Sequence, residues 1–275
     1  MKGKRNMTSK KQVKVYKSNE LNEANFNDYN LSVYRVFLTI LAKMQRHDIN
    51  GNPLPLEKLS RYCTLSAKEY EKQFPSVGNR AYEILQQATK KLMKTSITLP
   101  YDDKNIIEIN ACSSAIYKKS DGIIEIEFTD KIMPHLKVLE GKFTMFNLSE
   151  IAGFGSIYTT RIYELLMQYK TTGRLETSIP NLREKIGCTK IFKQYAHLKQ
   201  RAIQHAVDEI NSQWTLDLTY QEIKTGRTVT DLVFTFKPTF TRKAYDPISK
   251  KMRTQLTRPR RKTKEEISTS KPKKS

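Results

Sequence analysis

The order of elements expected over residues 156–237 constrains the fold more than any other feature of this chain. Apolar residues recur at helical spacing up to Gly173, a residue type that commonly ends helices. Ser178 is a suitable N-cap for a short second helix, which ends at Gly187. A longer third helix is predicted over residues 190–211. The stretch therefore predicts a helix, a short helix and a long helix in succession.

A β-hairpin is expected directly after these helices. Two strand-like runs, residues 215–223 and 228–236, flank a turn at Thr225-Gly226. Lys224 and Arg227 place two positive charges at the tip of this hairpin. A helix-turn-helix followed by a hairpin is the order of a winged-helix domain.

The third helix has an apolar side and a polar side that holds no carboxylate before Asp208. Lysine, arginine and glutamine side chains reach phosphates and base edges in the major groove of DNA. An ordinary solvated surface is the alternative, but such surfaces usually mix both signs of charge. We therefore predict that this side contacts DNA through seven residues: Lys190, Lys193, Gln194, His197, Gln200, Arg201 and Gln204. Lys224 and Arg227 at the hairpin tip are predicted to contact DNA as well.

The N-terminal half repeats the same order of elements. A helix is predicted from residue 31 to about residue 44, and two short helices over residues 56–62 and 66–74, the second with Ser66 and Glu69 as a capping box. A longer helix is predicted over residues 79–94, and strand-like runs follow between residues 96 and 128. The two long helices begin alike, with Tyr82-x-x-Leu85 and Tyr195-x-x-Leu198. We interpret this likeness as an internal structural repeat. A second DNA-contacting face is expected at Asn79, Arg80, Gln87, Lys90 and Lys94, although Glu83 shares that face.

The fold class that follows is α+β, with two tandem winged-helix domains flanked by basic tails. The C-terminal domain is the DNA-binding one, and the short segment between the domains holds two glycines and is expected to be a linker that forms a hinge or a turn. The expected boundaries are a flexible basic arm at 1–18, the first domain at 19–148, the linker at 149–155, the second domain at 156–241 and a disordered tail at 242–275.

Three ordered motifs mark the C-terminal half: R-I-Y-E-L-L-x-Q-Y at residues 161–169, D-E-I-N at 208–211 and I-K-x-G-R at 223–227. Together they resemble the iteron-binding plasmid replication initiators, the Rep proteins. The likeness extends less specifically over residues 16–238. One departure is His205-Ala206, where the family often carries Pro-Ala, and this difference affects the expected bend of the third helix.

The resemblance implies a cytoplasmic, plasmid-associated bacterial protein that binds directly repeated sites (iterons) in double-stranded origin DNA. It further implies opening of adjacent A·T-rich DNA and recruitment of the host initiator protein and the replicative helicase. A homodimer in equilibrium with the monomer would bind an inverted-repeat operator and repress its own gene. A winged-helix transcription regulator without a role in replication is the alternative.

The net charge of +21 indicates a polyanionic partner. Residues 1–17 hold seven lysines and arginines and no acid, whereas residues 242–275 hold thirteen against three acids. Because most of the excess charge lies in these two tails, it should bind a phosphate backbone without regard to sequence. The tail after residue 241 is therefore expected to add affinity and no specificity.

Motifs of common catalytic sites are absent from the sequence. It contains no G-x-x-x-x-G-K-[ST] loop, no H-E-x-x-H and no pair of histidines one residue apart, which nicking initiators use. Cys63, Cys112 and Cys188 stand far apart, which favours reduced, buried thiols over a zinc site. We expect no enzymatic activity, no cofactor and no metal, with a nicking initiator of atypical site as the enzymatic alternative. No apolar run reaches membrane-spanning length, so no membrane partner is expected.

Overall fold

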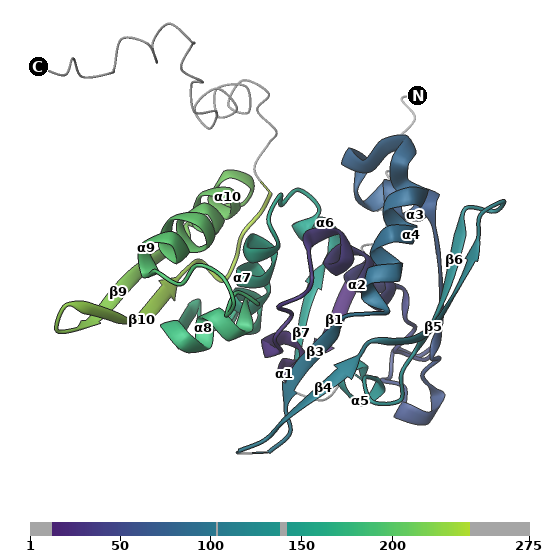
Figure 1. Cartoon of the computed structure of the whole chain (residues 1–275), viewed down its shortest axis with the longest axis horizontal. Helices are drawn as coiled ribbons and strands as arrows, with labels where there is room; N and C mark the ends of the chain where they lie inside the picture. Colours follow the sequence, from purple (N-terminus) through teal and green to yellow (C-terminus); the bar gives the residue numbers. More distant parts are fainter. Residues whose placement is uncertain (1–12, 103, 138–141, 243–275) are drawn as a thin grey trace, which may run out of the picture.

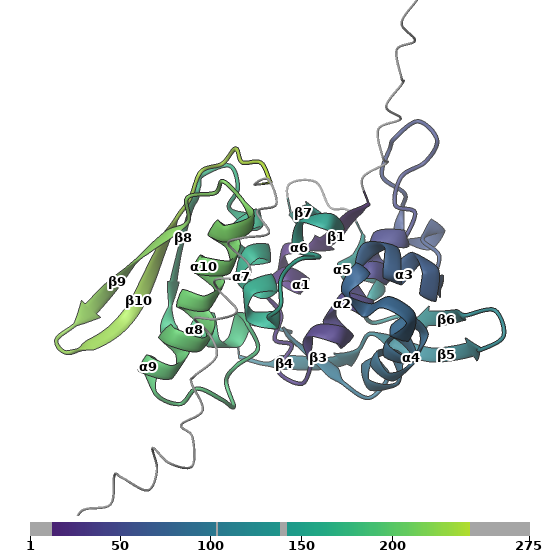
Figure 2. The same ribbon diagram turned by 90° about the horizontal axis from the view of Figure 1, so that it is seen from above.

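Two groups of helices and strands lie side by side in the structure, a computed structural model that describes residues 13–102, 104–137 and 142–242 (Figure 1). We call residues 13–149 the N-terminal unit, residues 150–155 the junction and residues 156–242 the C-terminal unit. Seen from above, helix α7 (Ile157–Gln168) lies at the boundary between the two groups (Figure 2). Most of the expected basic arm and tail, residues 1–12 and 243–275, lies outside the described residues.

The C-terminal unit has the predicted winged-helix order. After α7 come α8 (Ile179–Lys185), α9 (Tyr195–Leu198), a π-helical turn (Lys199–Gln204) and α10 (His205–Gln213). We call the continuous helical segment of residues 195–213 the recognition helix. The strands are β8 (Arg174–Ser178), β9 (Thr219–Thr225) and β10 (Thr228–Thr235), which form an antiparallel sheet in the order β8-β10-β9.

The predicted helix signals in this unit are confirmed by local geometry. The hydroxyl of Ser178 accepts a hydrogen bond from the Asn181 amide at 3.3 Å, as an N-cap does. Gly173 follows α7 with a φ of 65°, and a Cβ built there would lie 2.5 Å from the Phe236 carbonyl oxygen. Only glycine fits both the left-handed backbone and this close approach.

One strand and two boundaries differ from the prediction. Strand β8 was not expected, and it adds to the hairpin as the neighbour of β10. The recognition helix begins at Tyr195 and not at residue 190, because the chain turns through a positive φ of 52° at Phe192. The first hairpin strand begins at Thr219 and not at residue 215, after Asp217 with a φ of 51°.

The N-terminal unit contains more elements. Its helices are α1 (Asn19–Glu23), α2 (Leu31–Lys43), α3 (Ala67–Gln73), α4 (Ala81–Leu92), α5 (Met133–Leu136) and α6 (Leu148–Ile151), which reaches into the junction. Two 3₁₀ turns lie at Leu56–Lys58 and Pro75–Arg80. Its strands are β1 (Lys14–Ser18), β2 (Tyr62–Ser66), β3 (Ser96–Pro100), β4 (Ile106–Asn110), β5 (Cys112–Lys118), β6 (Ile123–Phe128) and β7 (Phe143–Asn147).

The predicted internal repeat is visible in the sheet topology. One N-terminal sheet has the order β2-β6-β5 and the C-terminal sheet has the order β8-β10-β9. The strand that follows α2 in one unit, or α7 in the other, pairs with the second strand of the hairpin, and all pairs are antiparallel. The N-terminal unit adds the β3–β4 hairpin between helix α4 and the hairpin β5–β6. The fold is therefore two winged-helix domains in tandem, as predicted.

Two predictions in the N-terminal unit had different outcomes. The capping box at Ser66 is confirmed, because its hydroxyl accepts from the Glu69 amide at 3.2 Å while Glu69 Oε2 accepts from the Ser66 amide at 2.9 Å. The short helix expected over residues 56–62 was wrong. Its first half is a single 3₁₀ turn, and Tyr62 begins β2 because the alternation of Cys63 and Leu65 suits a strand buried on one face.

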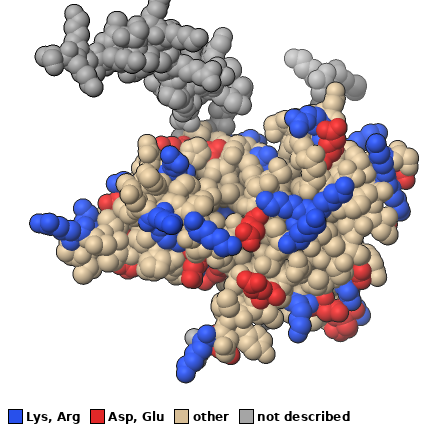
Figure 3. Space-filling view, viewed as in Figure 1, with Lys and Arg blue, Asp and Glu red and all other residues tan. Residues whose placement is uncertain are grey.

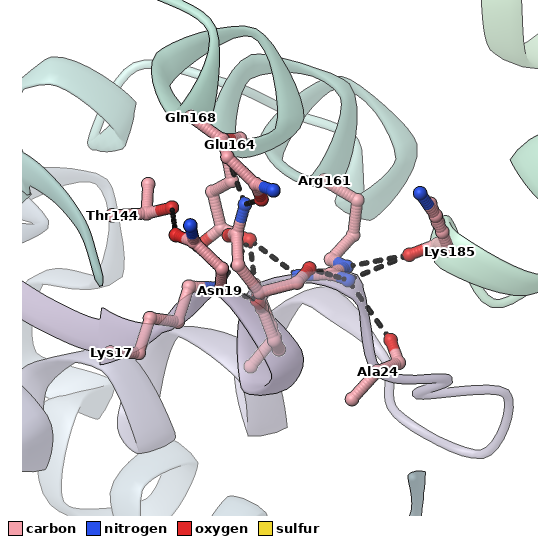
Figure 4. A network of polar contacts seen from close by, with 10 residues as sticks. Lys17, Asn19, Ala24, Thr144, Arg161, Glu164, Gln168 and Lys185 are labelled. Atoms are coloured by element: carbon pink, nitrogen blue, oxygen red, sulfur yellow. Dashed lines mark hydrogen bonds and ion pairs between the residues drawn. The ribbon is translucent and has the colours of Figure 1, made fainter. Parts of the chain in front are cut away.

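Residues 14–18 also correct a prediction, since they form β1 and are not part of a flexible arm. This strand pairs antiparallel with β7, and the Lys17 side chain is fully buried. Its ammonium group lies 2.9 Å from Glu164 Oε2 of α7, and Arg161 Nη1 lies 2.7 Å from the same oxygen. Figure 4 shows these side chains converging from β1 and α7. A buried ionic cluster thus joins the two units.

Backbone carbonyls complete the surroundings of Arg161. Its Nη2 donates to the carbonyl oxygens of Asn22 at 2.6 Å, Ala24 at 3.0 Å and Lys185 at 2.7 Å (Figure 4). The Tyr34 hydroxyl of α2 donates to Glu164 and accepts from Arg161. Because α7 packs against both units, the apolar core runs continuously through the boundary.

The junction is held from both sides as well. Arg35 of α2 donates to the Phe154 carbonyl at 2.7 Å. From α10, Glu209 accepts from the Gly155 amide at 2.7 Å and Gln213 donates to the Gly153 carbonyl at 3.1 Å. A segment with these contacts is a fixed turn, which is one of the two expected forms, and not a free hinge.

Candidate nucleic-acid interface

The recognition helix buries one side and exposes the other, as its sequence predicts. Leu198, Ala202, Ala206 and Ile210 are fully buried in the core. The opposite side carries His197, Gln200 and Arg201 in exposed positions and Gln204 in a half-buried one. These four predicted residues are brought together on one helix.

The π-helical turn lies within this exposed stretch. A π turn holds more residues than an α turn, and such insertions are frequent at functional sites. It spans Lys199–Gln204 and ends directly before His205, where the sequence departs from the family that it resembles. Side chains after the turn are therefore rotated relative to a regular helix.

Three predicted contact residues lie outside the recognition helix. Lys190, Lys193 and Gln194 are exposed in the loop that precedes it. Arg183 holds this loop by donating to the Lys193 carbonyl at 3.3 Å. Lys190 turns away toward the N-terminal unit, where its Nζ lies 3.5 Å from Asp28 Oδ1.

The wing presents the two basic residues predicted for it. Lys224 and Arg227 are exposed on either side of Gly226, whose φ of 61° forms the turn. The hairpin projects from the body of the molecule, and Lys and Arg side chains gather at its end in the space-filling view (Figure 3). Basic groups at a projecting tip can reach a phosphate backbone beside a groove.

Strand β9 connects the wing to the recognition helix through polar contacts that the sequence analysis missed. Glu222 Oε1 accepts from the Tyr195 hydroxyl at 2.8 Å and lies 2.7 Å from Lys199 Nζ. The Tyr220 hydroxyl donates to Gln204 Oε1 at 3.1 Å, and Gln204 Nε2 donates to Asp208 at 3.0 Å. The alternation of Tyr220 and Glu222 on one strand face was the available signal.

These contacts shift the ionisation of the groups involved. The hydrogen bond from Lys199 holds the pKa of Glu222 below its usual range, and the same bond raises the pKa of Lys199. Burial and the bond to Glu222 raise the pKa of Tyr195. Glu222 and Lys199 are therefore both charged near neutral pH.

The second predicted face, on the N-terminal unit, is only partly helical. Gln87 and Lys90 are exposed on α4, and Lys90 Nζ lies 5.8 Å from the ring centroid of Tyr117 on the wing strand β5. Asn79 and Arg80 are exposed in the 3₁₀ turn before α4, and Lys94 is exposed two residues beyond its end. Arg80 Nε lies 3.9 Å from Glu83, so this face carries both signs of charge.

Metal binding, thiol chemistry and membrane insertion have little support in the described part of the chain. No group of three or more His, Cys, Asp or Glu side chains among these residues could hold a metal ion. Cys63, Cys112 and Cys188 are buried and free, and burial raises the pKa of each thiol, to about 11, about 12 and about 11. Within the same residues, none of the helices is both long and apolar enough to span a lipid bilayer.

The repeated topology, with an exposed helix beside a hairpin in each half, defines a tandem winged-helix protein. The chain belongs to the family of plasmid-type replication initiators: the model described as "Initiator Replication protein, WH1" matches residues 14–167, and "Initiator Rep protein, WH2" matches residues 178–236. The first match ends inside α7, the helix that packs against both units.

Individual proteins also resemble this chain in sequence or in fold. A replication initiation protein of Escherichia coli is 24% identical over 225 residues, which are 80% of this chain and 68% of that protein. An uncharacterised 27.6 kDa protein of Escherichia coli is 23% identical over 239 residues, which are 79% of this chain and 92% of that protein. The crystal structure of the Pi initiator protein in complex with iteron DNA matches 83% of this chain and 98% of its own, with a TM-score of 0.68 and 20% identity.

Proposed function

We propose that the protein initiates plasmid replication by binding directly repeated iterons in double-stranded origin DNA. The observation that carries the proposal is the recognition helix of a replication-initiator family member, whose exposed side holds His197, Gln200 and Arg201 beside a basic wing. Such side chains suit base edges and phosphates in a major groove. The Pi initiator, which has the same fold, is known in complex with iteron DNA.

The further steps of initiation form part of the same proposal. Binding to several adjacent iterons would concentrate protein beside an A·T-rich tract, open it and recruit the host initiator protein and the replicative helicase. A homodimer would present its two C-terminal units about a two-fold axis and so prefer an inverted-repeat operator, whereas the monomer would prefer direct repeats. Dimerisation depends on concentration, so high copy number would favour repression.

Footprinting on the origin of its own plasmid tests the binding step. We expect protection at regular intervals over direct repeats and none on a shuffled duplex of equal length and composition. Protection of an inverted repeat alone, with no replication of a minimal plasmid that carries the origin and this gene, would identify a transcription regulator. Monomer and dimer fractions, each tested against direct and inverted repeats, examine the switch, and equal preferences would contradict it.

A further inference from the structure

Glu222 of strand β9 points its carboxylate toward the recognition helix, and its neighbours across the sheet, in strand β10, are apolar. Glu222 pairs with Leu232, and Tyr220 pairs with Phe234. Leu232 and Phe234 are fully buried, and residues directly opposite each other in a sheet share one face. Glu222 therefore lies at the edge of the face that packs against the helix, where an aliphatic side chain would extend the core.

The carboxylate holds one turn of the recognition helix against the wing. Its Oε1 binds both Tyr195, at 2.8 Å, and Lys199, at 2.7 Å, which are four residues apart. The Glu222 side chain is 19% exposed and that of Lys199 is 45% exposed, so the pair stands at the rim of the core beside the exposed side. Lys199 is thus a cation of the proposed interface that already has a partner.

We propose that Glu222 is a specificity determinant, which keeps Lys199 on the wing and away from the DNA backbone. The inference rests on the proposed binding of DNA by the recognition helix. A free lysine contacts phosphates in any register, and a phosphate contact carries no sequence information. On a cognate site the base contacts fix the helix in one register, so Lys199 has little freedom to find a phosphate. On random DNA no register is fixed, and a freed Lys199 would add one contact.

Four variants test the inference: Glu222→Gln, Lys199→Gln, the double variant, and Glu176→Gln as a control. The neutral amide of Glu222→Gln can still accept the bond from the Tyr195 hydroxyl but has no charge to hold the Lys199 ammonium group, and the unfolding temperature checks that the fold is kept. Glu176 is exposed on β8, the opposite edge of the same sheet, and its Oε2 lies 3.0 Å from Arg174. Each protein is titrated with an iteron duplex and a shuffled duplex over a range of salt concentrations.

We expect Glu222→Gln to bind the shuffled duplex roughly five- to tenfold more tightly at about 0.1 M salt, with a salt slope steeper by about 0.9, as one added phosphate contact requires. Affinity for the iteron should change less, so the specificity ratio falls. Lys199→Gln alone should leave binding to the shuffled duplex within about twofold, and in the double variant it should abolish the gain. Glu176→Gln should resemble the wild type.

Three results would overturn the inference. An unchanged ratio and slope in Glu222→Gln would show that the pair has no role in discrimination. Equal weakening on both duplexes would show that Glu222 only supports the helix, and a gain that persists in the double variant would show that Lys199 is not involved. Failure of the proposed function is separate, because the wild-type protein itself would then bind both duplexes equally.

Discussion

Arg201 stands on the exposed side of the recognition helix, and no ion pair engages its guanidinium group among the described residues. This arrangement differs from Lys199 and Gln204, whose side chains are bound to β9. A guanidinium group without a competing carboxylate can form two parallel hydrogen bonds to guanine. The sequence predicted the exposure of Arg201 correctly, since helical periodicity decides which side a residue faces. It could not predict the contacts of Lys199, which depend on a strand more than twenty residues later.

Arg201→Ala should weaken binding to the cognate iteron by about 1–3 kcal/mol and leave binding to random DNA almost unchanged, because a base contact is lost. Titration of both duplexes measures the difference. Arg174→Ala is the control, since Arg174 is exposed on β8 and paired with Glu176. Equal losses on both duplexes would mean that Arg201 contacts only phosphate, and no loss on either would mean that another side of the helix binds DNA.

At the scale of single helices and strands, some sequence patterns were sufficient to predict an element and others were not. Long amphipathic helices such as α2, α4 and α7 were predicted because many residues repeat the same period. Strand β8 was missed because five residues, with only Leu175 and Thr177 buried, give too short an alternation to separate from a turn. The start of the recognition helix was misplaced because a positive φ at Phe192, which is not a glycine, has no signature in the sequence.

The exposed side of α4 leads to a prediction about the length of the footprint. If α4 and the recognition helix both enter the major groove, a monomer should protect about two helical turns, with the contacts roughly 10 base pairs apart. The double variant Gln87→Ala, Lys90→Ala should lose protection over one turn and keep the other. Lys131→Ala, which removes an equal charge at an exposed position before α5, is the control. Deletion of the N-terminal unit is a poorer test, because it would uncover Arg161 and Glu164.

At the scale of the whole molecule, the buried cluster of Lys17, Arg161 and Glu164 determines how the two units are joined. Each of the three side chains is fully buried, and a buried charge is costly unless it is paired. No pattern in the sequence indicates this cluster. The R-I-Y-E motif was recognised, but the burial of its Arg and Glu depends on a lysine more than 140 residues earlier in the chain.

The cluster predicts unequal effects of removing its members. Glu164→Gln leaves the buried Arg161 guanidinium group without a carboxylate and removes the attraction that favours protonated Lys17, so it should lower the free energy of unfolding by about 3–5 kcal/mol. Lys17→Met keeps the pair of Arg161 and Glu164 at 2.7 Å and should cost clearly less. Urea denaturation of both variants measures the difference, and equal losses would contradict the assigned pairing.

Lys17 also predicts a dependence of stability on pH. Desolvation by burial lowers its pKa from 10.5 to about 7, against the attraction of Glu164. Between these values the unfolded state binds one more proton than the folded state, so the free energy of unfolding should rise with pH by up to about 1.4 kcal/mol per unit. The advantage disappears as the pH falls to about 7. Urea denaturation of the wild type and Lys17→Met from pH 7 to 9.5 should show a widening difference, whereas parallel curves would place the Lys17 pKa elsewhere.

The fixed junction has a consequence for the DNA that such a protein can recognise. Arg35, Glu209 and Gln213 bind the backbone of residues 153–155 from both units, so the distance and rotation between α4 and the recognition helix are built into the chain. Such a protein fits only DNA in which the two groove contacts lie at one fixed distance and rotation. Base changes within a repeat should then weaken binding less than the insertion of half a helical turn in its middle. The length of the repeats in the origin should therefore change in evolution only together with the protein.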